Sequence, residues 1–499
     1  MLETMERLVA LDRERALLVH IGAILGWDQE TYMPENAIEE RAEQLAMIEG
    51  LAHEKAVRPE IGELLASAEA RTDLDEAAKA YLKVARREFN KETKLPSRLV
   101  TEMAKQTSLS QAAWIQARKN DDFSAFAPHL STMIDLNLEM ASALDPDSPA
   151  YDVLLDLYEI GSDQCGTAAV FATMKADLLR ILGKITASAQ VDDSFLSRKV
   201  SPADQKAMNE YLLDALGFDR KRGRLDVTAH PFTTTLGRQD IRITTRYLED
   251  YFPSSIFSTI HEAGHAFYEM GINPYPDYQG TRLAEAVSMG IHESQSRLLE
   301  NIVGRSFSFW SCHYPTIKEL AKGSLDGVDL EAFVKAINKV EPSLIRVEAD
   351  EVTYGLHIIA RFELESALIS RTLAVKDLPE AWNAKMKELL GLEVPDNARG
   401  CLQDIHWSMG AFGYFPSYAL GNLYAAQFWD SLKEALPEAE QGMEAGEIAP
   451  ILGWLERNIH ELGATYLPHE LVWRVSGKPL DPSHFATYLE EKYRRIYGW

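Results

Sequence analysis

Apolar residues recur at helical spacing through most of this chain. In the first 70 residues the repeating positions include Leu8, Leu11, Leu17, Leu18 and Ile21. A spacing of three or four residues places such side chains on one face of a helix. The pattern breaks at Met33-Pro34 and then resumes, and helical patterns also dominate residues 73–223 and 308–499. The sequence therefore predicts a mainly α-helical protein.

A different pattern occupies residues 225–234 and 241–247, which are rich in Thr, Val, Ile and aromatic residues. Residues 236–240 between them have the composition of a turn, so we expect a small antiparallel hairpin. This is the only substantial β element that the sequence predicts. Its exposed edge could pair with an extended peptide.

No internal repeat, low-complexity linker or clear domain boundary divides the 499 residues. Length alone would allow several domains. Helical hairpins built around one groove explain the continuous pattern better than a string of separate units. We therefore expect residues 1–499 to form a single domain.

Composition narrows the classes of function. The formal net charge of -25 argues against a protein that binds nucleic acid or anionic membranes. The negative electrostatic field of such a protein could favour cationic peptides. The three cysteines are far apart, which indicates neither a disulfide framework nor a thiolate metal site. The amino terminus has no signal-peptide pattern, and the apolar run at residues 16–27 is too short to span a bilayer. We therefore expect a cytoplasmic protein.

The most informative motif is His261-Glu262-Ala263-Gly264-His265. Positions i and i+4 of a helix lie on the same face, so His261 and His265 can present two imidazoles to one metal ion. Glu262 faces the same opening, where it could take a proton from an activated water molecule. The small Ala263 and Gly264 would let another element approach closely. The alternative interpretation is a buried helix whose two histidines have only structural partners.

A catalytic zinc site needs a third protein ligand, and a later helix is predicted at residues 283–302. Glu293 on that helix would complete a His-His-Glu set. His292 is the competing ligand, and Glu285 is a weaker candidate.

Three clusters stand out in the last third of the chain, at residues 345–350, 354–357 and 400–423, and the second and third are unusually rich in Gly, Tyr, His and Trp. This composition is uncommon for a plain core helix. It is typical of the wall of a site.

These motifs together resemble the carboxypeptidase Taq family of metallocarboxypeptidases. The resemblance covers most of the chain in seven ordered blocks: Trp27 to Pro34, His230 to Phe232, Asp240 to Thr244, the motif at His261 to His265, His292 to Gln295, Ile345 to Asp350, and Gly400 to Trp407. It implies a two-lobed helical fold with a deep groove, similar to neurolysin, with an N-terminal lid at about residues 1–70 and a catalytic core at about 224–430. It also implies a homodimer.

The resemblance implies that His261, His265 and Glu293 are the metal ligands and that Glu262 is the general base. One divalent ion per chain is expected, with Zn²⁺ as the chemical default and Co²⁺ or Mn²⁺ as alternatives.

A carboxypeptidase must also recognise a free C-terminal carboxylate, and a guanidinium does this well because it offers two parallel donors. Arg346 is the first candidate and Arg242 the second. Each could instead form a structural ion pair, with Asp350 or Asp240 respectively.

The oxyanion of the tetrahedral intermediate needs further hydrogen-bond donors. His406, Tyr414 and Tyr418 resemble in spacing the His and Tyr donors of related metallopeptidases. His230 is expected to orient the substrate, or else to brace the hairpin.

The sequence therefore predicts a metallocarboxypeptidase that removes C-terminal residues from short peptides. Two alternatives stay open. One is an oligoendopeptidase that cuts internal bonds on the same scaffold, and the other is a non-catalytic helical protein.

Overall fold

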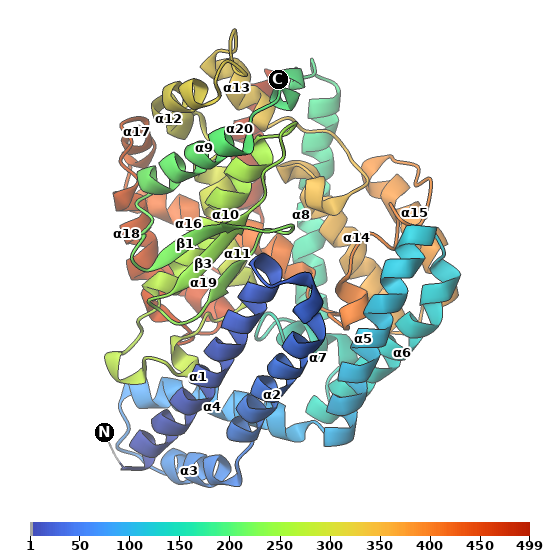
Figure 1. The fold of residues 1–499 in the computed structure, drawn as a ribbon, viewed down its shortest axis with the longest axis vertical. Helices are drawn as coiled ribbons and strands as arrows, with labels where there is room; N and C mark the ends of the chain where they lie inside the picture. The colour runs from blue at the N-terminus through green and yellow to red at the C-terminus, as the bar shows by residue number, and fades with distance from the viewer. Residues whose placement is uncertain (1–2) are drawn as a thin grey trace.

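The computed structural model describes residues 3–499, which fold into α-helices around one small sheet (Figure 1). The helices before the sheet are α1 (Glu3–Thr31), α2 (Ile38–Ala56), α3 (Pro59–Glu69), α4 (Glu76–Lys94), α5 (Ser97–Asn120), α6 (Phe123–Leu144), α7 (Ala150–Asp156), α8 (Gln164–Thr186) and α9 (Pro202–Ala215). Those after it are α10 (Pro253–Gly271), α11 (Met289–Arg297), α12 (Phe307–Leu320), α13 (Leu330–Ile337), α14 (Glu351–Ile369), α15 (Leu378–Leu390), α16 (Pro416–Ala435), α17 (Ala439–Glu444), α18 (Ala449–Asn458), α19 (Pro468–Ser476) and α20 (Ser483–Tyr497). The predicted mainly helical class is confirmed.

The sheet contains β1 (Gly223–Val227), β2 (Thr233–Thr235) and β3 (Ile241–Thr245) in the order β1-β3-β2. Strands β2 and β3 form the predicted antiparallel hairpin, but β1 lies parallel to β3. The prediction of one strand over residues 225–234, and of purely antiparallel pairing, is therefore wrong. Pro231 interrupts the stretch, because proline has no N–H to donate and restricts the residue before it.

The helix predicted at residues 283–302 begins later than expected. Ser288 caps α11 by accepting a hydrogen bond from the Ile291 N–H at 3.1 Å. The helix then continues without a break as a π-helical segment, Leu298–Val303. π-Helical turns are rare and often occur at functional sites.

The apolar core is divided into two parts. A small cluster joins α1, α3 and α4 to Tyr278 and Leu283, while a much larger one fills the rest of the described chain. Helices α1–α4 lie together at one end of the molecule, and α12 and α13 lie at the other (Figure 1). Helix α10 packs against β3, α9 and α11 in the large core.

Gly264 allows α10 and α11 to touch. A Cβ atom at this position would lie 2.6 Å from the carbonyl oxygen of Gln295 and 2.6 Å from the Cα of Ser296. Both atoms belong to the backbone, so they cannot move aside as a flexible side chain can. The predicted close approach at Gly264 is confirmed.

We expect Gly264→Ala to destabilise the protein by about 1–3 kcal/mol, the usual cost of overpacking a core. This cost exceeds the gain of about 1 kcal/mol that alanine brings to a helix. Urea unfolding measures the difference. Gly183→Ala in α8 is the matched control, because nothing lies within 4 Å of its added Cβ and it should be neutral or stabilising. A Gly264→Ala variant as stable as the control would contradict this account.

Candidate metal centre

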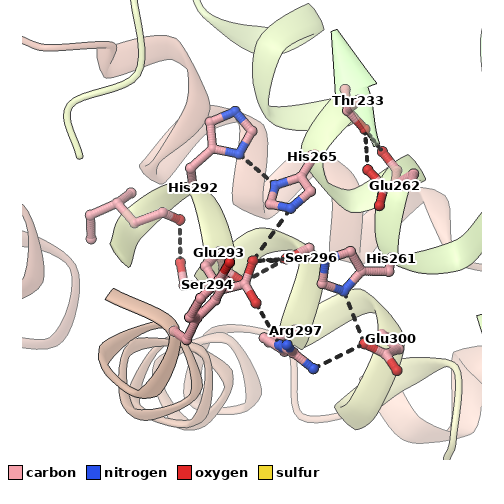
Figure 2. A network of polar contacts seen from close by, with 12 residues as sticks. Thr233, His261, Glu262, His265, His292, Glu293, Ser294, Ser296, Arg297 and Glu300 are labelled. Carbon is pink, nitrogen blue, oxygen red and sulfur yellow. Dashed lines mark hydrogen bonds and ion pairs between the residues drawn. The ribbon is translucent and has the colours of Figure 1, made fainter. Parts of the chain in front are cut away.

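Helices α10 and α11 bring three potential ligands together (Figure 2). Each of His261, His265 and Glu293 offers one ligand atom, and these three atoms all lie within 4.8 Å of one another. The Nε2 nitrogens of the two histidines are 3.7 and 3.4 Å from Oε2 of Glu293. Two imidazole nitrogens and one carboxylate form a donor set that suits a divalent cation such as zinc. The three residues therefore fit a metal site, and a four-coordinate ion bound there would have one position left for a further ligand.

The outer nitrogen of each histidine has its own partner. His261 Nδ1 lies 2.9 Å from Glu300 Oε2, and His265 Nδ1 pairs with Nδ1 of His292. His292 in turn contacts Glu269 Oε1 at 2.8 Å through its Nε2. Such partners fix the ring orientation of metal-binding histidines and leave Nε2 free for the ion.

Two rival ligands from the sequence lie outside this cluster. His292 contacts the outer nitrogen of His265, on the side away from Glu293 (Figure 2). Glu285 has a side chain that is 54% exposed and pairs with Arg15. Of the three candidates for third ligand, the geometry brings only Glu293 to the Nε2 nitrogens.

The carboxylate of Glu293 is held by a half-buried cation, Arg297. Arg297 Nε donates to Glu293 Oε1 at 2.7 Å. Burial alone would raise the pKa of Glu293, but Arg297 and the two histidines outweigh it and hold that pKa well below its usual value. Gly421 of α16 makes room for this side chain, because a Cβ there would lie 2.6 Å from Glu293 Cγ.

The histidines differ in their electrostatic surroundings. Burial, with a further contribution from His292, lowers the pKa of His265 to about 3, so this imidazole is neutral and has a lone pair for a metal. Burial would also lower the pKa of His261, but the carboxylates of Glu293 and Glu300 raise it instead.

Glu262 lies beside the three ligand candidates without joining them (Figure 2). Its side chain is buried, and its Oε2 accepts a hydrogen bond of 2.6 Å from the Thr233 hydroxyl on β2. Burial raises the pKa of Glu262. A raised pKa suits a carboxylate that must both accept and return a proton near neutral pH.

The segments predicted to form a wall converge next to this centre. His406 Nε2 lies 3.3 Å from the Tyr418 hydroxyl, and the rings of Tyr414 and Tyr418 are 5.2 Å apart. Burial raises the pKa of both tyrosines, and the nearby charge of Glu293 adds to the effect. Burial lowers the pKa of His406 to about 4. All three side chains are therefore neutral near pH 7, and each has an O–H or N–H group that can donate a hydrogen bond to an oxyanion.

Arg346 is 5% exposed and forms an ion pair of 2.9 Å with Asp404. Its Nη1 also donates to the Tyr354 hydroxyl at 3.1 Å. The structural ion pair considered as an alternative role for Arg346 is thus present, but with Asp404 and not with Asp350, whose carboxylate caps α14 by accepting from the N–H groups of Val352 and Thr353.

The two remaining substrate candidates lie in or next to the sheet. Arg242 forms its expected ion pair with Asp240 at 2.9 Å and stacks on the Trp27 ring, 4.1 Å from its centroid. His230 is exposed in the segment between β1 and β2. Neither joins the three ligand candidates.

Four residues around the centre were not singled out from the sequence: Thr233, Glu269, Arg297 and Glu300. Glu300 had a usable signal, since it follows Glu293 by two helical turns and thus faces the same side. Arg297 also lies one turn from both glutamates, whereas Thr233 and Glu269 are defined by contacts with Glu262 and His292, 29 and 23 residues away, which periodicity does not reveal.

Residues 7–493 match the family described as carboxypeptidase Taq (M32) metallopeptidase. The chain belongs to the carboxypeptidase Taq family. It is 42% identical to thermostable carboxypeptidase 1 of Thermus thermophilus and 40% identical to carboxypeptidase 1 of Bacillus subtilis, over 99% and 95% of both chains respectively. The crystal structure of the M32 carboxypeptidase from Deinococcus radiodurans superimposes with a TM-score of 0.97 at 38% identity and covers 99% of this chain and 100% of that one.

Family membership confirms the resemblance drawn from the sequence motifs. The protein is a metallocarboxypeptidase, and membership in this metallopeptidase family implies that it uses a divalent metal ion. No helix within residues 3–499 of this carboxypeptidase is long and apolar enough to cross a membrane.

We expect Glu300→Gln in this carboxypeptidase to weaken metal binding by about 10- to 100-fold, the usual cost of losing a partner of a metal-binding histidine. Glutamine keeps the shape but loses the charge that faces His261, Arg297 and Arg305. Metal competition with a chromophoric chelator measures the affinity. Glu319→Gln, on the exposed surface of α12, is the control, and equal affinities for the two variants would contradict the prediction.

Proposed function

We propose that His261, His265 and Glu293 hold the metal ion of this carboxypeptidase and that Glu262 is its general base. The observation that supports this most strongly is the convergence of three ligand atoms within 4.8 Å. Glu262, hydrogen-bonded to Thr233, lies beside them. We propose Zn²⁺ as the ion, with Co²⁺ and Mn²⁺ as alternatives, because a His-His-Glu set accepts all three.

A divalent cation in this site would supply Lewis acidity, which polarises a peptide carbonyl and makes a water molecule more acidic. Glu262 takes a proton from the attacking water at a carboxylate oxygen and later returns it to the leaving amine. The Thr233 hydroxyl restricts the rotation of that carboxylate by its hydrogen bond of 2.6 Å. His406, Tyr414 and Tyr418 are the proposed donors to the oxyanion.

We propose Arg346 as the group that recognises the free C-terminal carboxylate. Its ion pair with Asp404 fixes the plane of the guanidinium, and five N–H groups leave donors beyond those used by Asp404 and Tyr354. We propose smaller roles for Arg242 and His230, which would orient the peptide near the edge of β2. Arg242 lies in β3 of the hairpin, and His230 lies just before β2.

Further properties are proposals as well. The homodimer, the lid and the catalytic core are drawn from the family resemblance, and the cytoplasmic location and the single domain are drawn from the sequence. The protein is a cytoplasmic homodimer, residues of about 1–70 form a lid, and residues of about 224–430 form the catalytic core of a single domain. Helices α1 and α3 of this lid share a separate apolar cluster with α4, Tyr278 and Leu283. Analytical ultracentrifugation tests the dimer, and a monomer at micromolar concentration would contradict it.

The test of the activity is mass spectrometry of two matched peptides, one a free acid and one C-terminally amidated. The chelator-treated protein is assayed alone and after addition of Zn²⁺, Co²⁺ or Mn²⁺. We expect a ladder of C-terminal truncations only from the free acid and only with metal. Internal cleavage of both peptides would instead indicate an oligoendopeptidase, and no cleavage with any metal would contradict the proposed site.

A further inference from the structure

A cavity of about 340 Å³ adjoins the metal centre, and Arg297 and Glu300 form part of its wall. The same two residues support the ligand candidates, because Arg297 donates to Glu293 and Glu300 pairs with His261. Pockets for small ligands usually measure about 300–1,000 Å³. The cavity therefore has the size to hold one long side chain.

The lining of the cavity is polar and carries an excess of negative charge. Its carboxylates are those of Asp193, Glu300, Glu341, Glu348, Asp350 and Glu351, and its cations are Arg297, Arg305 and Lys339. Each of the three cations is already paired, and among the carboxylates Glu351 is neutralised by Lys492 at 2.7 Å. Arg297 and Arg305 contact Glu300, and Lys339 contacts both Asp193 and Glu341. The field inside the cavity thus favours a positively charged guest.

Several acceptors in the lining have no partner. Asn338 is 3% exposed, and its Nδ2 donates to the carbonyls of Arg305 and Val334 while its Oδ1 is unpaired. The hydroxyl of Ser343 is also buried and unpaired. The exposed carboxylate of Glu348 has no ion-pair or hydrogen-bond partner among residues 3–499. The buried oxygens of Asn338 and Ser343 are costly to leave unpaired, and the exposed Glu348 adds an unpaired negative charge, so the three together favour a guest with hydrogen-bond donors and a positive charge.

The cavity also lies beside the proposed position of the substrate's C-terminus. Tyr354 lines the cavity, and its hydroxyl accepts the hydrogen bond from Arg346. A peptide whose carboxylate is bound at Arg346 would therefore have its last side chain next to this opening.

We propose that the cavity binds the side chain of the substrate's C-terminal residue and selects lysine and arginine. An ammonium offers three donors and a guanidinium five, with the positive charge that the lining lacks. This assignment rests on the proposed carboxypeptidase function and adds the class of substrate. Glu348 is the residue that contributes most to the selection, because its charge is not neutralised by a neighbour.

The experiment compares kcat/KM for peptides that differ only in the last residue, which is Arg, Lys, Leu or Glu. For the wild-type enzyme we expect at least a tenfold preference for Arg and Lys over Leu. Glu348→Gln should reduce that preference about tenfold, mainly through KM, and Glu348→Lys should shift it toward the peptide that ends in Glu. Glu331→Gln, on exposed α13 outside the cavity, is the matched control and should leave the preference unchanged.

Two results would overturn the assignment. One is equal cleavage of all four peptides by the wild-type enzyme, and the other is an unchanged preference in both Glu348 variants. In either case the C-terminal truncation itself would still support the proposed function. A complete absence of truncation would instead contradict that function, and this inference with it.

Discussion

Replacing Glu262 by glutamine is expected to lower kcat by about 10²- to 10⁴-fold, the usual contribution of a general base. Glutamine has the same shape and can still accept the hydrogen bond from Thr233, so the surroundings should not change. Its amide cannot take a proton from water. Initial rates with a free-acid peptide give kcat and KM, and elemental analysis of the same samples gives the metal content.

The control for this experiment is Glu319→Gln, which removes a carboxylate from the exposed surface of α12. Both variants should keep their metal, and only the first should lose activity. An active Glu262→Gln enzyme would show that another group accepts the proton. An inactive variant without metal would show that Glu262 acts as a ligand rather than a base.

The helices and one strand pair were predictable from local patterns, whereas the parallel pairing of the first strand was not. Thr-rich and Ile-rich segments indicated strands on both sides of the turn at residues 236–240, and β2 and β3 do form that hairpin. Strand β1 pairs with β3 through a parallel register from Gly223↔Ile241 to Val227↔Thr245. Periodicity shows that a segment suits a strand but does not show which neighbour it meets.

Some residues of the proposed metal centre could be predicted from the sequence, and others could not. The four-residue spacing of His261 and His265 places both on one helical face, so their joint position follows from local geometry. Glu293 came from a predicted helix and a family resemblance, and the structure brings it to their Nε2 nitrogens. The ion pair of Arg346 with Asp404 joins segments 58 residues apart. Such a contact depends on the tertiary fold, and the sequence suggested the nearer Asp350 instead.

A row of alternating charges, Glu293, Arg297, Glu300 and Arg305, explains why Glu293 stays ionised in a buried position. Arg297 pairs with both Glu293 and Glu300, and Arg305 pairs with Glu300 from the other side. A buried charge is tolerated only when it is paired. Removal of either carboxylate should therefore affect the neighbouring arginine as well as the proposed metal site.

We expect Glu293→Gln to weaken metal binding by more than about 100-fold, because it removes a ligand rather than a supporting group. The metal-free protein should also lose about 1.5–3 kcal/mol of stability, since Arg297 exchanges a charged partner for a neutral one. Chelator competition measures the first effect and urea unfolding the second. Glu285→Gln is the matched control, because that carboxylate is 54% exposed and pairs with Arg15 instead. Unchanged metal affinity in Glu293→Gln, or an equal loss in Glu285→Gln, would show that the third ligand is a different residue.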